Sequence, residues 1–118
     1  MTGLSVTGVP LSESKAELFK TLGHPTRIRV LELLQAGPRP VHALLEEIGV
    51  EASNLSQQLG VLRRAGLIRS SREGATVLYT LATPDVADLL LHARLILAAL
   101  WAEQELLLES LRSASETG

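Results

Sequence analysis

The stretch Glu51–Ile68, EASNLSQQLGVLRRAGLI, combines a leucine spacing typical of a helix with two adjacent amide side chains. At roughly 100° per residue, three leucines of this stretch fall on one side of a helix, namely Leu55, Leu59 and Leu62. Ser53 is a plausible N-cap. Polar side chains cover the opposite face and its flanks: Ser53, Gln57 and Arg64 opposite the leucines, and Asn54, Ser56, Gln58 and Arg63 beside them.

The residues after this helix predict a β-hairpin. Beyond Gly66 the apolar period changes from that of a helix to that of a strand, in LIRSSR and then TVLYTL. The two runs are separated by Glu73–Ala75, and Gly74 is suited to the tip of the turn.

A short helix is predicted before Glu51. The segment PVHALLEEIGV places Val41, Leu44, Leu45 and Ile48 on one side, and Gly49 ends it. Two short helices joined by a tight turn, the second polar on its outer face, form a helix-turn-helix unit. A hairpin directly behind them makes the unit a winged helix.

The N-terminal part predicts two further helices. Residues 1–10, with two glycines and a proline, are expected to form a flexible arm. A helix follows from Leu11, with Ser12 or Ser14 as its cap, and it stops near Gly23. Pro25 suits the first position of the next helix, where its missing N–H costs nothing, and His24 is its cap.

A last helix is predicted from Asp85 to about Arg112. The fold class is therefore mainly α with a small β-hairpin: four helices, two strands and a final helix. A chain of 118 residues suits one core. We expect a single winged-helix domain over residues 11–113, including N- and C-terminal dimerisation helices, and a disordered tail over residues 114–118.

Charge and composition exclude several classes of function. The chain has no cysteine, which excludes disulfides, thiolate metal sites and cysteine nucleophiles, and a reducing cytoplasmic setting fits. Because the net charge is −2, any affinity for nucleic acid must come from a local basic face. Such a face exists, since Ser53–Thr76 holds four arginines and one acid, a local charge of +3, namely Arg63, Arg64, Arg69, Arg72 and Glu73.

Amide side chains on the outer face of a helix suit the major groove of DNA. Glutamine or asparagine can satisfy an adenine edge at two atoms, whereas a carboxylate would be repelled by the phosphates. The alternative is a solvated helix face with ordinary surface arginines. The order of the elements favours DNA binding.

The sequence from about Leu18 to Leu81 resembles the ArsR/SmtB family of bacterial winged-helix repressors. LFKTLGHPTRIRVLELL is similar to the opening pattern of that family, and SNLSQQLGVLRRAGLIRSSREGATVLYTL to its recognition helix, Ala-Gly-Leu elbow and wing. The resemblance implies a homodimer that binds a palindromic double-stranded DNA operator and responds to an effector. It implies that Ser53, Asn54, Ser56, Gln57 and Gln58 enter the major groove, that Arg69, Arg72 and Thr76 of the wing meet phosphate or the minor groove, and that Arg63 and Arg64 contact phosphate.

The last helix predicts the dimer interface. Val86–Ala102 is apolar on nearly every side, which the surface of a small monomer does not tolerate. A membrane span is the rival, but 17 residues that include Asp88, His92 and Arg94 are too few and too charged. We expect burial against a second copy, with help from Leu18 of the first helix, through Leu89, Leu90, Ile96, Leu97, Leu100 and Trp101.

The sequence does not identify an effector. Relatives that sense metals use cysteines, or Asp and His on paired final helices, whereas the mid-helix positions that would be His are here Ile96 and Ala99. A different Ni, Zn or Co site could use His92 with Asp85 or Asp88. The alternatives are a structural hydrogen bond at that histidine, and a winged-helix dimer that acts with a separate sensor protein as its regulatory partner. No catalytic signature is present, so we do not expect an enzyme.

Overall fold

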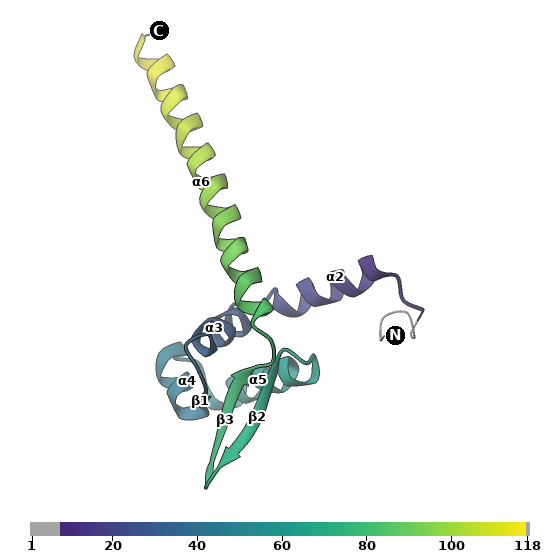
Figure 1. Cartoon of the computed structure of the whole chain (residues 1–118). Helices are drawn as coiled ribbons and strands as arrows, with labels where there is room; N and C mark the ends of the chain where they lie inside the picture. Colours follow the sequence, from purple (N-terminus) through teal and green to yellow (C-terminus); the bar gives the residue numbers. More distant parts are fainter. Residues whose placement is uncertain (1–7, 118) are drawn as a thin grey trace. The chain divides into compact units, whose positions relative to one another are not determined.

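The computed structural model describes residues 8–117, so most of the expected arm and the last residue of the expected tail lie outside the described residues. Figure 1 shows the elements in the predicted order of four helices, a hairpin and a final helix. They are α2 (Leu11–Leu22), α3 (Pro25–Leu34), β1 (Arg39–Pro40), α4 (Val41–Ile48), α5 (Ala52–Arg64), β2 (Ile68–Glu73), β3 (Thr76–Leu81) and α6 (Asp85–Thr117).

The chain divides into two compact units, Met1–Val86 and Ala87–Gly118. The first unit contains the winged helix, and the second is the larger part of α6. Every residue from Leu91 to Glu116 is exposed in the single chain. The second unit therefore has no core of its own.

The core of the first unit is built from leucines of successive helices. The predicted stripe of α5 is confirmed, because Leu55, Leu59 and Leu62 are each at most 2% exposed. α5 packs against α3 and the start of β2, and α4 packs against α3. The buried residues of these neighbouring elements include Val30, Leu31, Leu34, Leu44 and Ile68. Each such side chain contributes about 1.5–3 kcal/mol through burial, which fixes α5 against the rest of the unit.

The hairpin is confirmed, and a third strand joins it. β2 and β3 pair antiparallel from Ile68↔Leu81 to Glu73↔Thr76. Gly74, in the two-residue turn, has φ 63°, a conformation that favours glycine. β1 pairs with the other side of β3, so the order is β1-β3-β2. The sequence did not predict β1, because two residues carry no alternation and Pro40 is acceptable only on an edge strand.

Two of the predicted helix caps are wrong and one is confirmed. α2 begins at Leu11 and α5 at Ala52, neither with a side-chain cap, so the serines proposed as caps lie inside the first turns: Ser12, Ser14 and Ser53. The cap of α3 is as predicted, since Nδ1 of His24 accepts a hydrogen bond from the backbone N–H of Thr26 at 3.2 Å. Pro25 is the first residue of that helix.

The final helix is longer than the sequence predicted. It continues to Thr117, so residues 114–117, expected in a disordered tail, are helical. Thr83 is hydrogen-bonded to Asp85, the first residue of α6. The Oγ1 of Thr83 accepts from the backbone N–H of Asp85 and donates to Oδ2 of Asp85, each at 3.3 Å. Within residues 8–117 no helix is long and apolar enough to cross a membrane.

Candidate nucleic-acid interface

A tight elbow directs the chain from α5 into the hairpin. The backbone N–H of Gly66 donates to the carbonyl of Arg63, and that of Leu67 donates to the carbonyl of Leu62, both at 3.0 Å. Gly66 has φ 80°. This is the Schellman arrangement, which satisfies the last carbonyls of a helix and needs a left-handed residue after the C-cap. The buried Leu67 then anchors the hairpin to the end of α5.

The outer face of α5 is polar and lacks acids. Ser53, Ser56 and Gln57 are exposed, and Asn54 is half-buried. No Asp or Glu occurs from Ala52 to Arg64, although the whole chain holds 13 acids against 11 basic residues. This face therefore presents hydroxyl and amide groups, with two arginines at its C-terminal end, to whatever approaches it.

Gln58, which the sequence placed among the exposed major-groove residues, is instead buried. Its side chain is 6% exposed. The reason is its spacing, since Gln58 lies three residues after Leu55 and four before Leu62, on the edge of the buried stripe. The same spacing could have revealed its burial from the sequence.

The structure adds a residue that sequence reasoning missed. Arg27 of α3 donates from Nε to Oε1 of Gln58 at 2.8 Å. Its Nη1 donates to the backbone carbonyl of Thr21, in the last turn of α2, at 3.0 Å. Arg27 thus links α2, α3 and α5. No local pattern indicates this role, because its two partners are 6 and 31 residues away.

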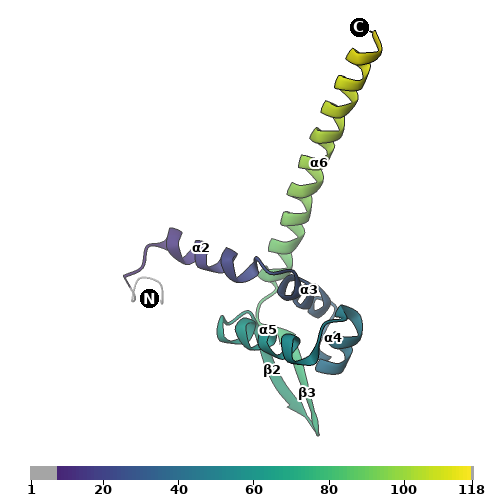
Figure 2. The ribbon, with the colours of Figure 1, turned by 180° about the vertical axis from the view of Figure 1, so that it is seen from behind.

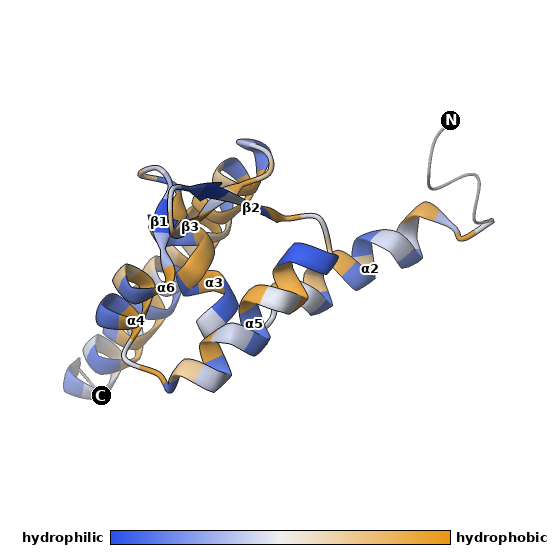
Figure 3. Cartoon of the chain, turned by 90° about the horizontal axis from the view of Figure 1, so that it is seen from below, coloured by the Kyte–Doolittle hydropathy of each residue, from blue (hydrophilic) through white to orange (hydrophobic). Residues whose placement is uncertain are grey.

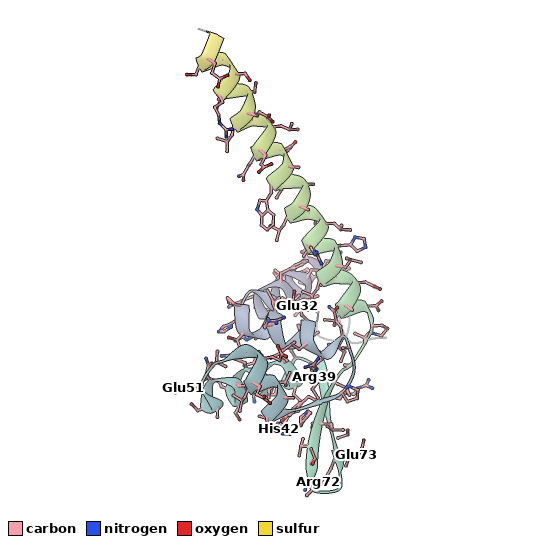
Figure 4. The ribbon with its side chains drawn as sticks, turned by 90° about the vertical axis from the view of Figure 1, so that its left-hand side faces the viewer. Glu32, Arg39, His42, Glu51, Arg72 and Glu73 are labelled. Atoms are coloured by element: carbon pink, nitrogen blue, oxygen red, sulfur yellow. The ribbon has the colours of Figure 1, made fainter. Side chains whose placement is uncertain are left out.

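The hairpin presents a second polar surface. Every residue of β2 after Ile68 is exposed, including Arg69 and Arg72, and Thr76 at the start of β3 is exposed as well. Figures 1 and 2 show the hairpin extending beyond α4 and α5, and Figure 3 shows β2 as hydrophilic. Figure 4 shows that Arg72 and Glu73 lie at its tip.

The arginines of these two surfaces form no salt bridge with any residue that the structure describes. Among the described residues the single salt bridge joins Nη1 of Arg29 to Oε1 of Glu32 at 3.6 Å. The four arginines in question are all exposed: Arg63, Arg64, Arg69 and Arg72. Their charges are therefore available to an anionic partner.

The second unit carries most of the exposed apolar side chains. Of thirteen exposed large apolar residues in the described part of the chain, ten lie on α6. Among the residues predicted for a dimer interface, Ile96, Leu97, Leu100 and Trp101 are 45–61% exposed, whereas Leu18, Leu89 and Leu90 are half-buried. The sequence prediction stopped at Ala102 and missed a second apolar group: Leu106, Leu107, Leu108 and Leu111.

The predicted metal ligands do not form a cluster in the single chain. Within residues 8–117 no group of three or more His, Asp or Glu side chains could hold a metal ion. Of the three candidates, Asp85 is hydrogen-bonded to Thr83, and Asp88 and His92 are exposed on α6.

Sequence comparison relates this arrangement to known regulators. A model described as a helix-turn-helix domain matches residues 22–71. The HTH-type transcriptional regulator Rv0081 of Mycobacterium tuberculosis is 52% identical over 105 residues, which are 88% of this chain and 92% of that protein. Its crystal structure superposes with a TM-score of 0.75 and 53% identity, over 80% of this chain and 96% of that one.

Two further structures share the fold. The transcriptional repressor BigR of Xylella fastidiosa gives a TM-score of 0.64 at 35% identity, over 75% of this chain and 87% of that one. The third is the homodimeric winged helix-turn-helix DNA-binding domain of Mb0332 from Mycobacterium bovis, a possible ArsR-family regulator. It gives a TM-score of 0.68 at 28% identity, over 83% of this chain and 88% of that one.

Proposed function

Because the chain belongs to the ArsR/SmtB family of winged helix-turn-helix transcriptional regulators, we propose that it represses transcription by binding a palindromic DNA operator as a homodimer. One observation carries this proposal. The exposed face of α5 is polar and contains no acidic residue, and the hairpin that follows α5 in the sequence has exposed arginines. These features occur in a protein whose net charge is negative.

We assign α5 to the major groove. Gln57 is exposed near the middle of the helix, where its amide has a donor and an acceptor to offer to adjacent atoms of one base edge. Ser53 and Ser56 are exposed on the same helix and have hydroxyls that donate or accept. Gln58 is left out of this set because it is buried.

We assign the arginines to the phosphate backbone. Arg69 and Arg72 are exposed on β2, and Arg63 and Arg64 are exposed in the last turn of α5. Each arginine that neutralises a phosphate releases counterions, which makes the affinity depend on salt. These contacts set the position of the protein on the duplex and leave base selection to α5.

The homodimer proposal is based on the apolar surface of α6. A helix that is apolar on most sides is buried against something, and the single chain leaves this one exposed. Spacings of three and four residues alternate along one stripe of α6: Leu90, Ala93, Leu97, Leu100, Gln104, Leu107 and Leu111. This is the heptad seam by which two helices pack together. We call these seven residues the α6 seam.

A two-fold dimer suits a palindromic operator. It places two recognition helices on one side of the duplex about 34 Å apart, one turn of B-form DNA. The seam fits a second copy because a two-fold axis brings the same apolar stripe of each helix together.

The proposal is tested by fluorescence-anisotropy titration of the protein with DNA from the region upstream of its own gene. We expect selective binding to an inverted repeat in the presence of competitor DNA. Gln57→Ala should cost about 1–3 kcal/mol of specific binding and relax the base preference. Gln35→Ala removes an exposed amide after α3 and is the matched control. Unchanged selectivity in Gln57→Ala would remove this residue from the readout.

The phosphate assignment has a separate signature. Arg72→Ala should weaken binding to every sequence and reduce the slope of log affinity against log salt concentration by about 1. Arg29→Ala removes the same charge from a residue that is paired with Glu32, and it should leave the slope unchanged. Equal slopes for wild type and Arg72→Ala would place Arg72 away from the DNA.

A further inference from the structure

Both ends of the buried amide of Gln58 are hydrogen-bonded within the protein. Its Oε1 accepts from Nε of Arg27 at 2.8 Å, and its Nε2 donates to Oδ1 of Asn54 at 3.0 Å. A buried carboxamide without partners would be costly, and no buried side-chain nitrogen or oxygen of the described residues lacks a partner. The three side chains therefore form one chain of hydrogen bonds from α3 to the side of α5.

The direction of this hydrogen-bond chain is set by the arginine. A guanidinium only donates, so Gln58 must turn its oxygen toward Arg27 and its nitrogen toward Asn54. Asn54 must then turn its oxygen toward Gln58. The positive charge at the start strengthens the first bond and polarises the next. Arg27 is itself held, because its Nη1 donates to the carbonyl of Thr21.

We propose that Arg27 and Gln58 are positioning residues that fix the amide of Asn54 with its oxygen inward and its NH₂ group directed to the DNA. Asn54 is half-buried, and the oxygen of its amide is the end that Gln58 holds. Asn54 then selects a hydrogen-bond acceptor on the operator, either on a base edge, such as guanine O6 or thymine O4, or on a phosphate. This inference rests on the proposed function.

Gln58→Glu tests this directly. The new carboxylate still accepts from Arg27, but it cannot donate, so the amide of Asn54 should turn over and direct its oxygen to the DNA. We expect the affinity for the wild-type operator to fall about tenfold, as for the loss of one hydrogen bond to a polar partner. In an Asn54→Ala background the same Gln58→Glu change should have no further effect, because the residue acts through Asn54.

Titrations against operators with single base changes separate the two kinds of acceptor. If the acceptor is a base edge, the effect of Gln58→Glu is confined to one position of each half-site, where bases that present a donor become preferred. If it is a phosphate, all operators lose affinity by the same factor. Both results support the inference. It is overturned if the affinity is unchanged, or if the loss is the same with Asn54→Ala.

If Gln58→Glu does not fold, a second variant, Arg27→Gln, tests the same inference. Arg27→Gln replaces a group that only donates with an amide that can present either end, so both orientations of Gln58 become possible. We expect the preference at the Asn54 position to relax in a folded dimer, checked by circular dichroism and sedimentation. Full selectivity in this variant would also overturn the inference. Failure of the proposed function is distinguishable, because the wild-type chain would then bind no inverted repeat at all.

Discussion

The two units of the chain differ in the burial of their apolar residues. In the winged-helix unit most leucines of α3, α4 and α5 are buried in one core, and the exposed surface carries the amides and arginines of the candidate interface. In the second unit every side chain from Leu91 to Glu116 is exposed, and ten of these residues are large and apolar. The first unit buries its apolar side chains as a folded domain does. The second unit exposes an apolar surface of the kind found at protein–protein interfaces.

We expect the largest effect from a substitution in the second unit. Leu97→Glu places a charge in the α6 seam and should give monomers by sedimentation, with operator affinity reduced about a hundredfold or more because the two half-sites are no longer linked. Leu95→Glu is the matched control, since Leu95 has similar exposure, 53% against 45%, and lies about 200° away around the helix. Monomers in both variants, or in neither, would contradict the seam.

Local spacing predicted the elements that local interactions determine. The stripe of Leu55, Leu59 and Leu62 and the turn at Gly74 follow from helical and strand periods, and the structure has both. The sequence missed what depends on distant partners. β1 exists because Arg39 and Pro40 meet β3 about 40 residues later. The hydrogen bond of Gln58 likewise depends on a distant residue, since its partner Arg27 lies 31 residues earlier. The contacts with DNA stay predictions.

The elbow between α5 and the hairpin tests the first unit alone. Gly66→Ala should lower the free energy of unfolding by about 1–2 kcal/mol, because an L-residue is strained at φ 80°. A Cβ there meets no atom within 4 Å, so the cost lies in the backbone. Denaturant titration measures it, and Gly66→Asn should recover part of the loss because asparagine tolerates this conformation. Equal stability of wild type and Gly66→Ala would show that the elbow is not strained.

The concentration dependence of the melting temperature sharpens the contrast between the units. A dimer melts at higher temperature as its concentration rises, because association stabilises the folded state. Gly66→Ala should shift the melting temperature down at every concentration and preserve that dependence. Leu97→Glu should abolish the dependence. If Gly66→Ala also abolished the concentration dependence, the elbow would affect dimerisation as well as the stability of the first unit.

The smallest expected effect has the opposite sign. Gly60 is helical, within α5, and the three atoms nearest to a Cβ there would all belong to the end of the Arg64 side chain, with Nη1 at 3.1 Å. A flexible guanidinium can move aside, so Gly60→Ala should stabilise the first unit by about 0.5–1 kcal/mol through the backbone entropy of glycine. The same titration measures this gain. A loss of stability would mean that Arg64 is held over Gly60, and Arg64→Ala added to Gly60→Ala should then restore the gain.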